Sequence, residues 1–254
     1  MQEVPTLTDI LRGDRRRRPV ADRRIAAGLR AELEDGIFEL SREMPRSAEL
    51  NVRPGDLRTH AGEATTTHPR LRGALVHELL RLGVSGHRVD DHFAEALAAW
   101  KSEHDDPAAL DRLDADELAR LATEVTAHGV TLERRLDVIN PLWRPRTSVA
   151  IVQRLGGGCV VARDRIDLVV GTIDSPTASV ALFDLTTSPL NSEHERVLRY
   201  HALMETLRSQ IAPLRVATMS TATGDVWSLD VDRTMLRRAM CELAETIAVK
   251  WRSQ

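Results

Sequence analysis

The spacing of apolar residues changes after Pro141, and this change constrains the fold more than any other feature of the sequence. Three short apolar segments follow, SVAIVQRL (148–155), CVVARDRIDLVVG (159–171) and SVALFDL (179–185). They are separated by GGG at 156–158 and by TIDSPTA at 172–178, which are typical turn sequences. Segments of this length and spacing predict three antiparallel strands joined as a meander.

The remaining segments of the second half alternate between helical and extended patterns. SEHERVLRYHALMETLRSQI (192–211) has apolar residues at helical spacing, and LRVATMST (214–221) and VWSLDV (226–231) resemble strands. A last helix is expected from Asp232 to about Trp251. The order β-β-β-α-β-β-α predicts an α+β fold with a mixed sheet of about five strands flanked by helices.

The first half is mainly helical. Helical spacing is shown by Ile25, Leu29 and Leu33, and again by three segments between residues 68 and 125. The third of these segments is expected to begin at Asp106-Pro107. Residues 47–68 are rich in Pro, Gly, Thr and Arg and predict a loop. We therefore expect a helical and loop N-terminal region with an Arg-rich arm over 1–69. One domain follows over 70–254, helical over 70–140 and with its core over 147–252.

Composition and charge narrow the class of protein. The chain is 42% hydrophobic and 29% charged, which fits a globular protein, and its net charge of −3 does not favour nucleic-acid binding over the whole surface. No apolar run reaches the length of a membrane span, and the first 20 residues are polar and Arg-rich. A cytoplasmic protein without membrane association is expected.

Two aspartates stand out because their neighbours in the sequence are apolar. Asp167 and Asp184 lie in strands that form one predicted hairpin, so both carboxylates could converge on one point. Two carboxylates held together repel unless a cation neutralises them, and Mg²⁺ or Mn²⁺ prefers such oxygen ligands. The alternative is that Asp167 pairs with Arg163 or Arg165 and that Asp184 only ends a strand. The spacing alone leaves both interpretations open.

Four segments together resemble a known family. They are RGALVHELL (72–80), RDRIDLVVG (163–171), VALFDLTTS (180–188) and HERVLRYHALM (194–204). In this order, and with these predicted element types, they resemble the RecB-like branch of the PD-(D/E)XK nuclease superfamily over roughly residues 72–251. The resemblance implies a metal-dependent nuclease that hydrolyses DNA phosphodiesters in repair, processing or phage defence.

The resemblance also implies roles for particular residues. His77, Asp167 and Asp184 match the ligands of Mg²⁺ or Mn²⁺, and Tyr200 matches the tyrosine of the helix that follows the last acid. The implied catalytic positions are therefore Asp167, Asp184, Thr186 and Tyr200. By itself, a histidine on a helix such as His77 is usually a packed or surface residue. Its place before the β-meander makes a ligand role equally expected.

Two departures from the family pattern affect these expectations. Thr186 stands where the family has a lysine that helps stabilise charge on the phosphate, and losing one such group typically costs on the order of 10²–10³ in rate. Arg196, which occupies the place of a family glutamine, and Arg199 are candidate substitutes, with Arg215 less favoured. Some relatives also carry a four-cysteine iron–sulfur cluster, but this chain has two cysteines, so no such cluster is expected.

Arginines supply the expected contacts to phosphate. The candidates are Arg15, Arg16, Arg17, Arg18, Arg196 and Arg199. The alternative for the N-terminal run is a solvated helix face or tail, which is the usual place of a charge run.

Three functions are compatible with the sequence. The first is a Mg²⁺- or Mn²⁺-dependent deoxyribonuclease acting on single- or double-stranded DNA. The second, favoured by Thr186, is a catalytically degenerate protein of the same fold that binds DNA or serves as a scaffolding subunit. Its candidate partners are a helicase or another repair or defence subunit. The third is an α+β protein without a nucleic-acid role, whose acids serve structure.

Overall fold

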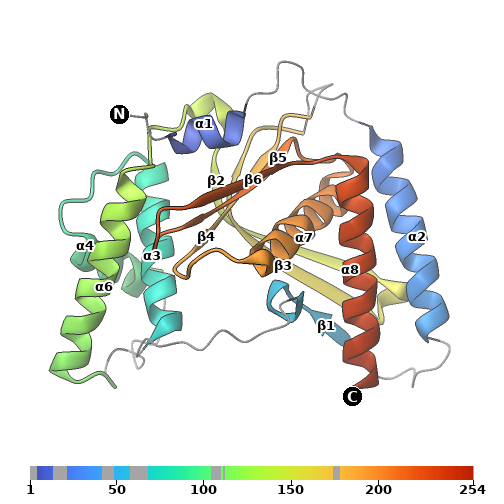
Figure 1. Ribbon diagram of the computed structural model, residues 1–254, viewed down its shortest axis with the longest axis horizontal. Helices are drawn as coiled ribbons and strands as arrows, with labels where there is room; N and C mark the ends of the chain where they lie inside the picture. Colours follow the sequence, from blue (N-terminus) through green and yellow to red (C-terminus); the bar gives the residue numbers. More distant parts are fainter. Residues whose placement is uncertain are drawn as a thin grey trace.

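The computed structural model describes residues 5–13, 22–41, 49–57, 68–103, 110, 112–173 and 178–253. It confirms the α+β class, with a mixed sheet of six strands rather than about five (Figure 1). The strands are β1 (Leu50–Val52), β2 (Arg146–Leu155), β3 (Val160–Val170), β4 (Ala181–Thr186), β5 (Arg215–Ser220) and β6 (Val226–Asp230). The α-helices are α1 (Leu7–Arg12), α2 (Arg23–Ser41), α3 (Pro69–Val84), α4 (His92–Glu103), α6 (Ala115–Glu133), α7 (Ser192–Ser209) and α8 (Arg233–Arg252). Short 3₁₀ turns cover Pro54–Leu57, Pro141–Trp143 and Gly156–Gly158.

The sheet contains the predicted meander. Strands β2, β3 and β4 pair antiparallel in chain order, β4 pairs parallel with β5 after the α7 crossover, and β5 pairs antiparallel with β6. One strand was not expected: β1 lies within the predicted loop at 47–68 and pairs parallel with the start of β3. A three-residue strand is too short to show an alternating pattern, and its partner is distant in the sequence.

Two helical layers cover the sheet. Apolar residues of α2, α7 and α8 pack on one face with β1, β2 and part of β3, and apolar residues of α1, α3, α4 and α6 pack on the other face. Figure 1 shows these two groups on opposite sides of the strands. The N-terminal elements α1, α2 and β1 therefore share hydrophobic cores with the segments after residue 70.

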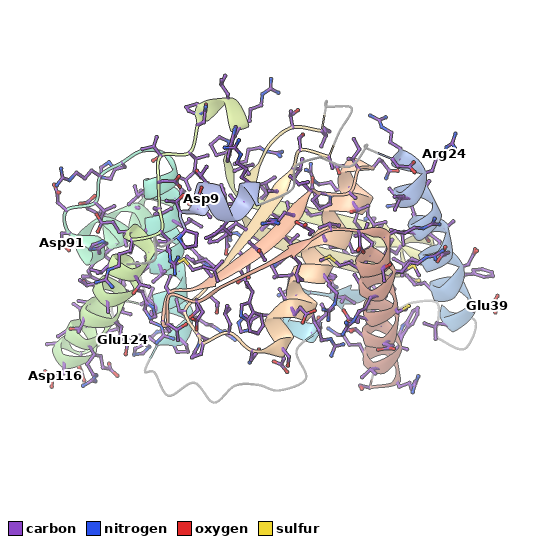
Figure 2. The ribbon with its side chains drawn as sticks, turned by 45° about the horizontal axis from the view of Figure 1, so that its top comes forward. Asp9, Arg24, Glu39, Asp91, Asp116 and Glu124 are labelled. Atoms are coloured by element: carbon purple, nitrogen blue, oxygen red, sulfur yellow. The ribbon has the colours of Figure 1, made fainter. Side chains whose placement is uncertain are left out.

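Helix α2 shows how the apolar spacing becomes packing. Ala26, Leu29 and Leu33 are buried along its inner side, while the side chains of Arg24 and Glu39 project away from the molecule (Figure 2). The described helices include none that is both long and apolar enough to cross a membrane.

Helix α6 begins at Ala115. Asp114 caps its first turn, because its carboxylate accepts the Glu117 N–H at 2.7 Å while the Glu117 carboxylate accepts the Asp114 N–H at 3.1 Å. This reciprocal capping box fixes the start at Ala115. The expected start at Asp106-Pro107 lies outside the described residues.

Candidate active site

The candidate site lies where one edge of β3 is left without a neighbouring strand. β2 pairs with β3 along almost its whole length and so occupies the other edge. On the candidate edge, β1 pairs with residues 160–162 and β4 with residues 168–170. Between them, helix α7 contacts this edge: the Tyr200 hydroxyl donates to the Arg163 carbonyl at 2.9 Å. Polar groups of β3 in this interval need partners other than a strand.

The two predicted acids meet at the end of this interval. The register that pairs Leu168 with Phe183 and Val169 with Leu182 places Asp167 opposite Asp184. The two carboxyl groups share a hydrogen bond, and Asp167 Oδ2 accepts the Leu185 N–H at 2.7 Å. The prediction that the hairpin brings these acids together is therefore realised in the geometry.

The backbone is irregular at the same place. The β2–β3 pairing passes over the position at which Ser148 would face Asp167, and Ser148 has a φ of 53°. Non-glycine residues with this backbone conformation are uncommon, and they occur often beside functional sites. Asp167 thus lies where both strand ladders of β3 are interrupted.

His77 completes the cluster from helix α3. Its Nε2 lies 3.4 Å from Asp167 Oδ2 and 3.2 Å from the Leu185 carbonyl oxygen. The His77 side chain is 42% exposed whereas the Asp167 side chain is 9% exposed, so the cluster opens to solvent on the His77 side. His77, Asp167 and Asp184 are called the acid cluster below.

The arginine partners expected in the alternative interpretation are not the groups that Asp167 contacts. Asp167 contacts His77 and the Leu185 N–H rather than Arg163 or Arg165. The Arg163 guanidinium instead donates to Asn51 at 3.0 Å.

Two further residues, which the sequence did not single out, extend the acid cluster. His201 Nδ1 lies 2.9 Å from both carboxylate oxygens of Asp164, and its Nε2 lies 3.6 Å from Asp184 Oδ1. The sequence does indicate that Asp164 is buried, because this acid alternates with the core residues Ala162 and Ile166 on one face of β3. His201 gave no such signal, because α7 is buried around its whole circumference.

Electrostatics set the protonation of the acid cluster. Burial, together with the neighbouring Asp184, raises the pKa of Asp167 to about 7, although His77 and the Leu185 N–H oppose this shift. Burial also acts to raise the pKa of Asp184, but the His201 imidazole outweighs it, so the pKa of Asp184 is lowered. With a pKa of about 7, Asp167 rather than Asp184 is the acid that takes up a proton near neutral pH.

The neighbouring acids raise the pKa of both imidazoles. Burial would lower the pKa of His77, but Asp167 and the Leu185 carbonyl raise it above its ordinary value. Burial also acts to lower the pKa of His201, and Asp164 and Asp184 together raise it well above the ordinary value.

The structure does not bring Tyr200 into the acid cluster. Its side chain is fully buried and its hydroxyl is bound to the Arg163 carbonyl, which anchors α7 to β3. Burial raises the pKa of the Tyr200 hydroxyl. Thr186 follows Asp184 by two residues on the same side of β4, and its hydroxyl accepts the Ser188 N–H at 3.2 Å.

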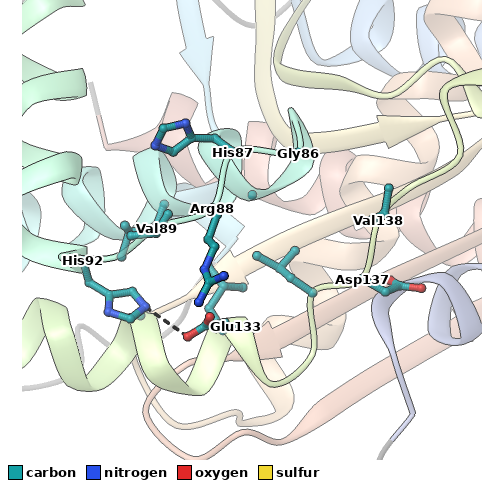
Figure 3. A pocket seen from close by; sticks show the side chains of 13 residues that line it. Gly86, His87, Arg88, Val89, His92, Glu133, Asp137 and Val138 are labelled. Carbon is teal, nitrogen blue, oxygen red and sulfur yellow. Dashed lines mark ion pairs between the residues drawn. The ribbon is translucent and has the colours of Figure 1, made fainter.

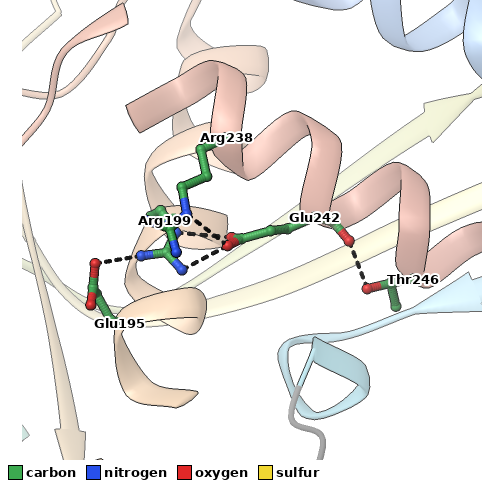
Figure 4. Close-up of polar contacts among 5 residues, drawn as sticks. All are labelled: Glu195, Arg199, Arg238, Glu242 and Thr246. Atoms are coloured by element: carbon green, nitrogen blue, oxygen red, sulfur yellow. Dashed lines mark hydrogen bonds and ion pairs between the residues drawn. The ribbon is translucent and has the colours of Figure 1, made fainter. Parts of the chain in front are cut away.

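The predicted phosphate contacts are dispersed. Arg199 is 3% exposed and is bound by both oxygens of Glu242 at 2.7 and 2.9 Å and by Glu195 at 2.6 Å (Figure 4). It connects α7 to α8 and is not free to contact DNA. Arg196 is half-buried, and its Nε has no hydrogen-bond partner among the described residues. The remaining candidates, Arg15, Arg16, Arg17 and Arg18, lie outside the described residues.

The donors of the acid cluster suit a hard cation by chemistry. Two carboxylates, the Leu185 carbonyl and the His77 imidazole are the ligand types that Mg²⁺ and especially Mn²⁺ accept. As the described side chains stand, however, no three His, Cys, Asp or Glu groups are arranged to hold a metal ion. In their place is the contact of His77 Nε2 with Asp167 Oδ2, which a bound cation would have to loosen.

A separate cavity of about 280 Å³ lies in the helical layer, away from the acid cluster (Figure 3). Its wall includes Leu79, Val89 and Leu132, and Arg88 and Glu133 lie at its polar side. His92 Nε2 lies 3.5 Å from Glu133 Oε2 there. None of the acid-cluster residues lines this cavity.

Comparison with known proteins adds little to this description. No family model matches the sequence, and no curated protein matches it. The solved structure of the archaeal protein SSO0001 aligns with 86% of this chain and 85% of that chain, at 11% identity and a TM-score of 0.35. At this TM-score the likeness does not define a shared fold.

Proposed function

We propose that this protein is a nuclease that depends on Mg²⁺ or Mn²⁺ and hydrolyses DNA phosphodiesters at the acid cluster. One observation carries the proposal. Two aspartates from adjacent strands lie together beside an imidazole from a third element, at a place that is open to solvent. Carboxylates are costly to bury side by side, so such a pair is typical of a site that binds a cation.

Each residue of the acid cluster has a distinct part in this function. Asp167, Asp184 and His77 would hold the ion, and the Leu185 N–H orients the Asp167 carboxylate. When bound, the ion supplies a lowered pKa for a coordinated water and stabilises charge on the phosphate. His77, as the most exposed member, marks the side from which DNA would approach.

Arg165 is the best-placed positive group for the DNA backbone. It precedes Asp167 by two residues on β3, so both side chains lie on the same side of the strand. Its side chain is exposed, and its charge acts to lower the pKa of His77, which places it near the acid cluster. An arginine there can contact a phosphate as the ion contacts its neighbour.

Digestion of plasmid and single-stranded DNA with Mn²⁺ tests the proposal. We expect cleavage by the wild type, none in EDTA, and a loss of at least 10²-fold in Asp184→Asn. Asp90→Asn is the matched control, because Asp90 is an exposed acid of the helical layer. Equal cleavage by Asp184→Asn and the wild type would show that the site is wrong.

A second function is favoured by Thr186 and by the lack of a three-ligand set among the described residues. The same fold would then bind DNA or a partner subunit without cutting. Filter binding of the same DNA distinguishes the two functions. Binding that is indifferent to metal, with no cleavage in Mg²⁺ or Mn²⁺, supports the degenerate protein and contradicts the nuclease.

A further inference from the structure

His201 is held between two carboxylates in the interior. Its Nδ1 faces both oxygens of Asp164 at 2.9 Å, and its Nε2 faces Asp184 Oδ1 at 3.6 Å. The side chains of His201 and Asp164 are 3% and 0% exposed, so water does not satisfy them. The Asp164 carboxylate is itself oriented by the Arg165 N–H at 2.9 Å.

This arrangement fixes the orientation of the ring. When the Nδ1–H is donated to Asp164, the opposite nitrogen necessarily points along β4 toward Asp184. Both ring nitrogens thus face carboxylate oxygens, Nδ1 within hydrogen-bond distance of Asp164 and Nε2 at ion-pair distance from Asp184.

The arginines expected to replace the missing lysine are engaged elsewhere or lack a contact to the acids. Arg199 is bound by Glu242, and Arg215 is bound by Asp230 and by the Ile10 carbonyl. His201, whose Nε2 lies 3.6 Å from Asp184 Oδ1, is instead the basic side chain beside this acid.

We propose that Asp164 and His201 form a positioning pair that orients the Asp184 carboxylate. The inference rests on the proposed function, since it assigns a role in the same acid cluster. His201 does not reach solvent, so it acts through Asp184 rather than on the substrate. Groups that orient a ligating carboxylate in this way commonly control metal affinity.

Calorimetric titration with Mn²⁺ tests the pair without relying on cleavage. The proteins are the wild type, His201→Gln, Asp164→Asn, the double variant, and His87→Gln as a control at an exposed histidine. We expect each single variant to bind Mn²⁺ about 10–100-fold more weakly, and His87→Gln to bind as the wild type does. Because Asp164 acts through His201, the double variant should be no weaker than His201→Gln.

A rescue experiment separates positioning from general damage. DNA cleavage by His201→Gln should recover when the Mn²⁺ concentration is raised about 10–100-fold, whereas cleavage by Asp184→Asn should not recover. Additive losses in the double variant, or wild-type Mn²⁺ affinity in His201→Gln, would overturn the pair while leaving the nuclease intact. If His201→Gln does not fold, Asp164→Asn decides the same question, since it keeps the ring. A wild type that binds no Mn²⁺ would overturn both proposals.

Discussion

Asp167 lies opposite Asp184 on neighbouring strands, and the Asp184 carboxylate helps to raise the pKa of Asp167 to about 7. The pair explains why two acids occur in otherwise apolar strands. Neither could be buried alone without a large electrostatic cost, and together they require a proton or a cation.

Replacing Asp167 by asparagine should change how stability depends on pH. The pKa of this acid rises from 3.8 to about 7 on folding, so the folded protein retains a proton that the unfolded chain releases. The contribution of Asp167 to the free energy of unfolding is therefore most favourable below pH 3.8, and it is lost progressively as the pH rises to 7. In EDTA at pH 8, Asp167→Asn should be more stable than the wild type, by on the order of 1–4 kcal/mol.

Denaturant unfolding at pH 5 and pH 8 measures this difference. Asparagine can still accept the Leu185 N–H through its amide oxygen, so the backbone contact is retained. The advantage of the variant should shrink at pH 5, where Asp167 is protonated in the wild type. A variant that is less stable than the wild type by the same amount at both pH values would contradict the assignment.

Manganese should stabilise the folded protein through the acid cluster. An ion that binds only the native state at 100 times its Kd raises the free energy of unfolding by about 2.7 kcal/mol. A thermal shift of that origin should disappear in Asp184→Asn and persist in Asp90→Asn, whose acid is exposed and distant. Equal shifts in all three proteins would mean that Mn²⁺ binds elsewhere.

Arg199 should prove to be a structural residue rather than a DNA contact. Its guanidinium is buried and paired with Glu242, so Arg199→Met leaves a buried carboxylate with one exposed partner, Arg238 at 3.2 Å. We expect a loss of about 3 kcal/mol, and less than 1 kcal/mol for Arg238→Gln, which breaks only the exposed half of the contact. A stable Arg199→Met that binds DNA less tightly would restore the original assignment.

Much of the fold followed from local patterns. The meander, the α7 crossover and the closing hairpin and helix were visible because each strand or helix has its own apolar period and turn residues. Asp167 and Asp184 were found for a related reason: a carboxylate between Val, Leu and Ile is conspicuous in sequence, and hairpin pairing brings neighbours together.

What could not be predicted depends on contacts between distant segments. β1 is defined by its partner on β3 rather than by its three residues. Arg199 lies on a helix that is buried all round, so its sequence could not show that Glu242 on α8 would neutralise it. The sequence does not indicate His201 for the same reason. Only the packing of α7 against β3 and β4 reveals its two carboxylate neighbours.

Arg165 should contribute to DNA affinity without contributing to stability. Its side chain is exposed, so Arg165→Gln should alter the free energy of unfolding by less than about 0.5 kcal/mol. One lost phosphate contact should lower the slope of log K against log salt by about one. Arg88→Gln removes an equally charged side chain that is 91% exposed in the helical layer, and it should leave that slope unchanged. Identical salt slopes for Arg165→Gln and the wild type would remove Arg165 from the interface.

Gly129 should be required for the packing of α6 against α4. A Cβ at this position would overlap the imidazole of His92, including atoms close to its backbone, so the ring cannot simply swing away. Gly129→Ala should therefore cost about 1–3 kcal/mol, although alanine is the better helix former. Gly28→Ala in α2 is the matched control: nothing lies within 4 Å of its added methyl group, and it should gain about 0.5–1 kcal/mol. Thermal unfolding of the two variants measures the contrast, and a stabilised Gly129→Ala would mean that α4 and α6 are not held as closely as His92 and Gly129 indicate.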